Sequence, residues 1–258
     1  MYTRHNTQKP VTGIPLRPDR HWSKEGLVGC LLFNEGGGNT VFDLSGNGNT
    51  GTLNGGLYWD SSYISHPPGI FWPGDVGDYI ELPTKGINAN IGTVIIAYTR
   101  DSGGGGYLFG HQNGNNRLYL KGVAYEIAIA DSSGLTLTNA NTASDVSQVL
   151  AIVYDNNAWR AYQDGAFINS GTYNGSISSL ASTWRIGDHN TDHSIWDGRI
   201  FYFYWWNRAL SASEIAQLYR EPFCMFWRDD IGLWKSEAAP TGNAGIMTCN
   251  TGFWGATF

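Results

Sequence analysis

Apolar and polar residues alternate along this chain in short runs separated by glycine, asparagine and aspartate, a pattern typical of strands joined by tight turns. The clearest example is the segment 149–169, which reads VLAIVYDNNAWRAYQDGAFIN. Its pairs Asn156-Asn157 and Asp164-Gly165 tolerate the positive φ angles that hairpin turns require. The segment therefore predicts three antiparallel strands, at 149–154, 158–163 and 166–169.

The same pattern predicts further short strands, separated by turn residues rather than by helical segments. Their ranges are 27–33, 79–82, 93–99, 107–110, 117–121, 125–130, 184–186 and 199–206. A dozen or so short strands with no helices between them predict two antiparallel sheets packed face to face. We therefore expect an all-β fold, a two-sheet antiparallel sandwich.

Only one segment carries a clear helix signal, and it comes late in the chain. Ser211 and Glu214 stand at the spacing of a capping box, and Leu210 and Ile215 stand at the spacing of a hydrophobic staple. Pro222 should end this helix after about two and a half turns. The helix face that docks on a sheet should be formed by Ile215, Leu218 and Tyr219.

Composition and charge agree with this pattern and narrow the class of partner. The 258 residues include 34 glycines and 14% aromatic residues, but only 15% charged residues, which suits strands and turns better than a helical bundle. A β-sandwich of this length can form one domain. The net charge of -6 argues against nucleic acid as a partner, because phosphate binding needs a basic face.

The first residues, the lengths of the apolar runs and the cysteines indicate the cellular compartment in which the protein is made. The first residues contain no apolar core of the kind found in signal peptides, and no run of about 18 apolar residues occurs anywhere. We therefore expect synthesis in a cytoplasm and no membrane partner. The odd number of cysteines, without metal-ligand spacing, predicts reduced thiols at Cys30, Cys224 and Cys249.

Four segments in a fixed order carry a family resemblance. They read GLVGCLLFNEGGGNTVFDLSGNGNTGTL, GIFWPGDVGDYIELP, AYQDG and RIGDHNTDHSIWDGRIFYFYWWNRALSASEIAQLY. Together they span residues 26 to about 220 and resemble the laminin-G-like jelly roll of the concanavalin A-like lectin and glucanase superfamily. The resemblance implies a jelly-roll sandwich whose rim loops bind sugars, proteins or calcium.

The glycine- and asparagine-rich turn after Val41 admits two interpretations. In the family that the chain resembles, such a turn often forms a calcium-binding edge, which implies Asp43, Asn47 and Asp197 as ligands and calcium as a cofactor. Calcium usually takes 6 to 8 oxygen ligands, more than these residues supply alone. In the second interpretation, the Asp43 carboxylate caps backbone N–H groups within a structural turn. Both remain open on the sequence.

Catalytic motifs are missing from the sequence. The glucanases of the superfamily carry paired carboxylates on one face of a strand. Here Glu126 and Asp131 are separated by an odd number of residues, so they would face opposite sides. The chain also lacks a G-x-S-x-G elbow, an H-E-x-x-H motif and a phosphate loop. We expect no enzymatic activity.

Sugar-binding candidates come from one polar loop and from aromatic residues that can stack on sugar rings. The loop sequence GDHNTDHSIW offers polar side chains beside tryptophans. The alternatives are a solvated loop and aromatic side chains that fill the space between the sheets. The candidate ligand-binding residues are Trp59, Tyr63, Trp184, Asp188, His189, Asp192 and His193.

The two ends of the chain differ from its middle. Residues 1–24 carry five basic side chains against one acidic side chain, a net charge of +4, so the remainder carries -10. We divide the chain into an extended basic arm, 1–24, a laminin-G-like domain, 25–221, and an aromatic, glycine-rich docking segment, 222–258. The arm could also be a disordered tail, and the last segment could fold back on its own domain. The candidate assembly residues are Arg4, Arg17, Arg20, Phe226, Trp227, Trp234, Trp254 and Phe258.

Synthesis in a cytoplasm, a lectin-like sandwich and two docking arms fit together in a virion. The chain resembles laminin-G-like proteins encoded by bacteriophages, which implies a decoration, head-fibre or tail-associated role. Its partners would be its own copies, other virion structural proteins and host or environmental glycans. The alternatives are a cellular, extracellular carbohydrate-binding module and a degenerate glycosidase.

Overall fold

The computed structural model describes most of the chain up to Phe226. The described residues are 9–10, 12–17, 21–61, 68–83, 85–88, 90–101, 106–113, 116–121, 126–129, 132–137, 143–174, 183–188 and 196–226.

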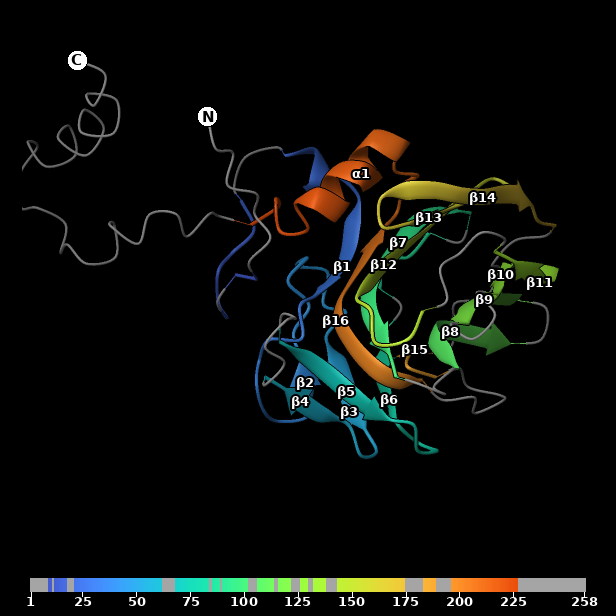
Figure 1. Cartoon of the computed structure of the whole chain (residues 1–258). Helices are drawn as coiled ribbons and strands as arrows, with labels where there is room; N and C mark the ends of the chain where they lie inside the picture. Colours follow the sequence, from blue (N-terminus) through green and yellow to red (C-terminus); the bar gives the residue numbers. More distant parts are fainter. Residues whose placement is uncertain are drawn as a thin grey trace, which may run out of the picture. The chain divides into compact units, whose positions relative to one another are not determined.

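Two eight-stranded antiparallel sheets form a sandwich, which confirms the predicted fold class (Figure 1). Sheet 1 runs in the order β14 (Ala166–Thr172), β13 (Ala158–Gln163), β12 (Gln148–Asp155), β7 (Ile91–Arg100), β16 (Asp197–Trp206), β5 (Gly69–Pro73) and β4 (Tyr58–Asp60), and β1 (Leu27–Leu31) also pairs with β16. Sheet 2 runs in the order β11 (Ser132–Thr136), β10 (Glu126–Ile129), β9 (Asn116–Lys121), β8 (Tyr107–Asn113), β15 (Trp184–Ile186), β6 (Tyr79–Leu82), β3 (Gly51–Asn54) and β2 (Thr40–Val41).

All the strands predicted from the pattern are present, with small shifts at their ends. The hairpin residues Asn156, Asn157 and Asp164 have the expected positive φ angles. Sequence reasoning missed five strands, because each is short or contains glycine and so lacks a long alternating run. They are β2, β3, β4, β5 and β11.

Strand β16 contributes to two hydrophobic cores, which explains why almost every residue from 200 to 206 is apolar. Ile200, Phe203 and Trp205 join the inner core between the two sheets. Tyr202 and Tyr204 lie in an outer core on the other face of sheet 1. A strand covered on both faces loses the polar alternation of a half-exposed strand.

Helix α1 (Ala212–Arg220) helps to cover the outer core and starts where the sequence predicts. The Ser211 hydroxyl accepts a hydrogen bond from the Glu214 N–H, and the Glu214 carboxylate accepts one from the Ser211 N–H, which completes the capping box. Ile215 and Leu218 are buried, but Tyr219 is 42% exposed. The predicted docking face was therefore wrong at Tyr219. Within the described part of the chain, no helix is long and apolar enough to cross a membrane.

The two terminal segments also form part of the outer core, as far as they are described. Leu16 makes a bridge with Phe226, and the Arg17 N–H donates to the Met225 carbonyl at 2.9 Å. Phe226 is fully buried. Its assignment as an assembly residue is therefore wrong, because a ring enclosed by its own domain cannot bind a neighbour.

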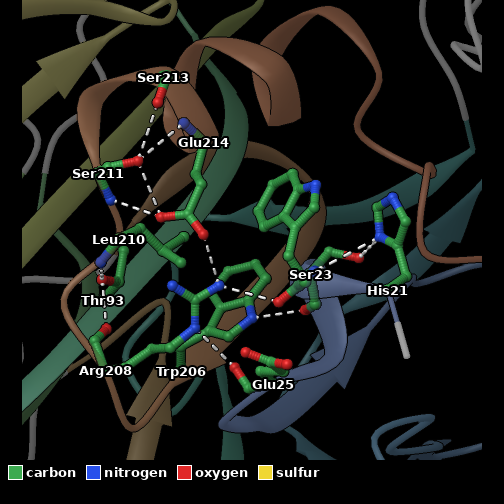
Figure 2. A network of polar contacts seen from close by, with 11 residues as sticks. His21, Ser23, Glu25, Thr93, Trp206, Arg208, Leu210, Ser211, Ser213 and Glu214 are labelled. Atoms are coloured by element: carbon green, nitrogen blue, oxygen red, sulfur yellow. Dashed lines mark hydrogen bonds and ion pairs between the residues drawn. The ribbon is translucent and has the colours of Figure 1, made fainter.

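Arg208 connects the N-terminal segment to helix α1 (Figure 2). Its guanidinium forms an ion pair with Glu214 at 2.8 Å and donates to the Glu25 carbonyl at 2.8 Å. Beside it, the Trp206 indole N–H donates to the Ser23 carbonyl at 2.7 Å. Residues 21–24, which the sequence assigned to the extended arm, are therefore built into the domain. Of the other proposed assembly residues in the terminal segments, Arg4, Arg20, Trp227, Trp234, Trp254 and Phe258 lie outside the described residues.

Lys9 joins the N-terminal segment to three other parts of the sandwich. Its ammonium group donates to the backbone carbonyls of Leu32, Pro68 and Phe201. Burial lowers the pKa of Lys9 to about 7, although the negative charge of Glu35 opposes this shift. Lys9 is therefore largely neutral in the folded protein above pH 7, while it stays protonated in the unfolded chain until about pH 10.

We expect Lys9 to make stability rise with pH between pH 7 and pH 9. In that window the unfolded chain binds the proton that the folded protein has lost, so the free energy of unfolding increases with pH. Urea denaturation of the wild type and of Lys9→Met should show the difference. The wild type should gain about 2 kcal/mol over Lys9→Met across this window. A constant difference between the two would contradict the assigned burial of the amine.

Candidate functional site

The Asp43 carboxylate is the centre of a structural turn. Its Oδ1 accepts hydrogen bonds from the N–H groups of Cys30 at 3.0 Å and Ser45 at 2.9 Å. Its Oδ2 accepts from the Ser45 hydroxyl at 2.8 Å and from the Asn49 N–H at 2.9 Å. The buried Asn49 amide then donates to the Val28 carbonyl at 2.7 Å. The turn thus fastens the β2–β3 connection to β1.

These contacts do not fit a calcium site made by the three predicted ligands. The four donors point hydrogen atoms at both Asp43 oxygens, where a cation would have to sit. The Asn47 amide nitrogen donates to the Leu27 carbonyl at 3.0 Å. Asp197 begins β16, seven residues before Tyr204, which pairs with Cys30 beside the turn, so it lies roughly 20 Å away along the strand. The structure brings Asp43 and Asn47 together, but not Asp197.

The structure also places some of the predicted ligand-binding residues. Trp184 is fully buried in the inner core, where its ring stacks on Phe109 with centroids 5.0 Å apart. Trp59 packs against the same core, and its indole N–H donates to the Gly38 carbonyl at 2.8 Å. Asp188 is buried in an ion pair with Arg185 at 2.7 Å. Trp184 and Asp188 therefore present no free surface for a sugar, whereas Trp59 is only partly buried. Tyr63, His189, Asp192 and His193 lie outside the described residues.

An exposed aromatic surface occurs instead on the outer face of sheet 1. Register places Tyr58 on β4 opposite Phe71 on β5, and Phe71 opposite Arg199 on β16. Because Ile70 and Trp72 on either side of Phe71 point into the inner core, Phe71 points outward. We call Tyr58, Phe71 and Arg199 the platform.

The platform is a continuous stack of three side chains. The rings of Tyr58 and Phe71 lie 4.9 Å apart at an angle of 36°. The Arg199 guanidinium carbon lies 4.7 Å from the centre of the Phe71 ring, in cation–π geometry. Tyr58 is 50% exposed, which makes it one of the few large aromatic side chains left open to solvent in the described structure.

Carboxylates surround the arginine of the platform. Arg199 Nε lies 2.7 Å from Asp60 Oδ2, and Nη1 lies 3.0 Å from Asp101 Oδ1. The backbone of Asp101 donates to the carbonyl of Asp197 at 3.2 Å. Desolvation raises the pKa of the Asp197 carboxyl, and the charge of Asp101 raises it further. Among the described residues, no three His, Cys, Asp or Glu side chains form a group that could hold a metal ion.

Comparison with protein families gives the identity of the fold. A laminin G family model, described as concanavalin A-like lectin/glucanases superfamily, matches residues 77–216, which is more than half of the chain. The chain belongs to this superfamily. The match confirms the part of the predicted resemblance that concerns the jelly-roll family. A search of curated proteins found no match.

Several solved structures share the concanavalin A-like fold with this chain. Domain 4 of the arabinanase AbnA from Geobacillus stearothermophilus, in complex with arabinotriose, is 18% identical with a TM-score of 0.59, and the match covers 74% of this chain and 97% of that domain. The binding domain of Paraclostridial Mosquitocidal Protein 1 is 18% identical with a TM-score of 0.60, over 76% and 52% of the two chains. Trypanosoma rangeli sialidase in complex with sialic acid is 17% identical with a TM-score of 0.57, over 78% and 33%. This chain therefore spans about half of the second protein's length and a third of the third's.

Sequence reasoning missed the platform because its residues come from three strands. Tyr58 and Phe71 lie in β4 and β5, neither of which was predicted. Arg199 offered a usable signal, because it lies directly before the apolar run 200–206. A charged side chain beside such a run needs a partner, which would have pointed to a polar cluster there.

Proposed function

We propose that this protein is a non-catalytic carbohydrate-binding domain and that the platform is its sugar contact. The observation that carries the proposal is the half-exposed Tyr58 ring stacked on Phe71 beside fixed polar groups. An aromatic face packs against the C–H face of a sugar ring, while nearby carboxylates accept hydrogen bonds from sugar hydroxyls. Asp60 and Asp101 are held in place for this by Arg199.

The same contacts favour binding over hydrolysis. A glycosidase needs one carboxyl group that is free to donate a proton and a second that acts as a nucleophile or base. Here Asp60 and Asp101 both accept hydrogen bonds from the Arg199 guanidinium, so neither is free for these roles. Arabinan or galactan incubated with the protein should therefore release no reducing ends.

We expect Tyr58→Ala to abolish retention of the protein on the polysaccharides that it binds. Loss of the ring removes the stacking surface, and the affinity should fall at least about tenfold. Affinity electrophoresis in gels containing arabinan, galactan or xylan measures this. Phe167→Ala is the matched control, since Phe167 is also an exposed aromatic residue, 57% exposed, but lies on β14 at the other edge of sheet 1. Equal retention of Tyr58→Ala and wild type would refute the site.

We also propose that the domain is displayed on a virion, made in the host cytoplasm and attached through its C-terminal residues. The described fold is complete at Phe226, yet five large aromatic residues follow it in the sequence, Trp227, Trp234, Phe253, Trp254 and Phe258. Large apolar side chains beyond a complete core favour association with a partner. The partners in this proposal are copies of the chain and other virion proteins, and neither nucleic acid nor a membrane is among them.

A further inference from the structure

The charges around the platform indicate which sugars it accepts. We infer that the platform binds uncharged sugars and excludes acidic ones, such as sialic and uronic acids. This inference rests on the proposed function, because it concerns the ligand class of the same site.

The first reason is that the only cation of the platform is already occupied. Arg199 Nε lies 2.7 Å from Asp60 Oδ2, and Nη1 lies 3.0 Å from Asp101 Oδ1. Both side chains are mostly buried, at 16% exposure for Arg199 and 9% for Asp60. A ligand carboxylate would have to displace one of these aspartates, which would then lose its partner in a poorly solvated position.

The second reason is an excess of negative charge. Two carboxylates, from Asp60 and Asp101, pair with one guanidinium, and a third, from Asp197, lies near enough to Asp101 to feel its charge. Asp101 and Asp197 repel each other strongly enough to contribute to the raised pKa of Asp197. A ligand anion brought to the same place would add a further repulsion, and like charges placed together at an interface weaken binding strongly.

Lys9, which contacts β16 at the Phe201 carbonyl, does not offset this excess. It contacts the carbonyl of Pro68, one residue before β5, and that of Phe201, two residues after Arg199 in β16. Its ammonium group is directed at these carbonyls and at that of Leu32. With a pKa of about 7, it also carries little charge above neutral pH. Lys9 is therefore not available to pair with a ligand.

An uncharged sugar satisfies every group on the platform. Its hydroxyl groups donate to Asp60 or Asp101, whose ionised oxygens accept but cannot donate. Its C–H face lies on the Tyr58 ring. A carboxylate brings no hydrogen to donate, so it could not make these hydrogen bonds.

The test compares matched ligands by calorimetry with the full chain. Arabinotriose, galactotriose and lactose are the neutral probes, and trigalacturonate and sialyllactose are the acidic ones. At least one neutral probe should bind, and its acidic counterpart should bind at least about tenfold more weakly at low salt. Raising the salt concentration should narrow this difference, because the repulsion is screened.

The charge variant is Asp197→Asn, which removes one negative charge but has no ion-pair partner to lose among the described residues. It should raise the affinity for the acidic probe severalfold and leave the affinity for the neutral probe within about twofold. Asp155→Asn is the control, because it makes the same change at the opposite end of sheet 1, where Asp155 pairs with Ile91.

The outcomes separate the two proposals. An acidic probe that binds as tightly as its neutral counterpart would overturn the inference and leave the proposed function standing. An unchanged preference in Asp197→Asn would overturn the electrostatic reason. Failure of every probe to bind would overturn the proposed function itself.

Discussion

A chain that ends at Phe226 is expected to fold as stably as the full protein, whereas a chain that ends at Glu221 is expected not to fold. Phe223, Met225 and Phe226 are almost completely buried in the outer core. Loss of a buried phenylalanine costs about 3 to 5 kcal/mol. Two phenylalanines and a methionine together approach the whole stability of a typical domain, about 5 to 15 kcal/mol.

Circular dichroism during thermal and urea denaturation measures both chains. The chain 1–226 should show one cooperative transition, and the chain 1–221 should show none. If the shorter chain unfolds cooperatively near the melting temperature of the full protein, the outer core does not depend on this segment. The chain 1–226 also tests the proposed attachment to a virion, because it should remain soluble but no longer join particles.

Replacement of Arg199 is expected to have the next largest effect. In Arg199→Met, the nearly buried Asp60 keeps its charge and loses the cation that lies 2.7 Å away. Removing one partner of a buried ion pair costs about 3 kcal/mol or more. The double variant Arg199→Met with Asp60→Asn should recover most of this loss, since a neutral amide tolerates burial better than an unpaired carboxylate.

Urea denaturation of the two single variants and the double variant gives the coupling energy directly. Arg220→Met is the control, because this exposed arginine at the end of α1 donates to the Ala216 carbonyl of its own helix, and its loss should change stability by less than about 0.5 kcal/mol. Additive losses in the double variant would show that Asp60 and Arg199 do not stabilise each other.

Much of the local structure could be predicted because its causes are local. The turns at Asn156-Asn157 and Asp164-Gly165 need residues that tolerate positive φ angles, and the structure shows those angles at Asn156, Asn157 and Asp164. The capping box between Ser211 and Glu214 involves residues three apart. The order of four motifs along the chain was enough to predict the superfamily, and the match to the family model confirms it.

The Asp43 turn shows where prediction from sequence reached its limit. The same residues fit a calcium-binding edge or a structural turn, because the sequence does not say which groups come near the carboxylate. Two of the four donors to Asp43, the N–H groups of Cys30 and Asn49, come from outside the residues next to it. Only the fold brings them to the two oxygens.

What the sequence determined by itself was the set of strands with clear alternation, their hairpin turns, the helix with its cap and the superfamily. The tertiary structure alone decided which aromatic residues are covered. Trp184 and Phe226 are enclosed in cores, while Tyr58 remains half exposed. It also decided that Tyr58, Phe71 and Arg199, which are far apart in the chain, form one surface. The reason is physical: turns and caps depend on neighbours in the chain, whereas burial and charge pairing depend on which strands lie side by side.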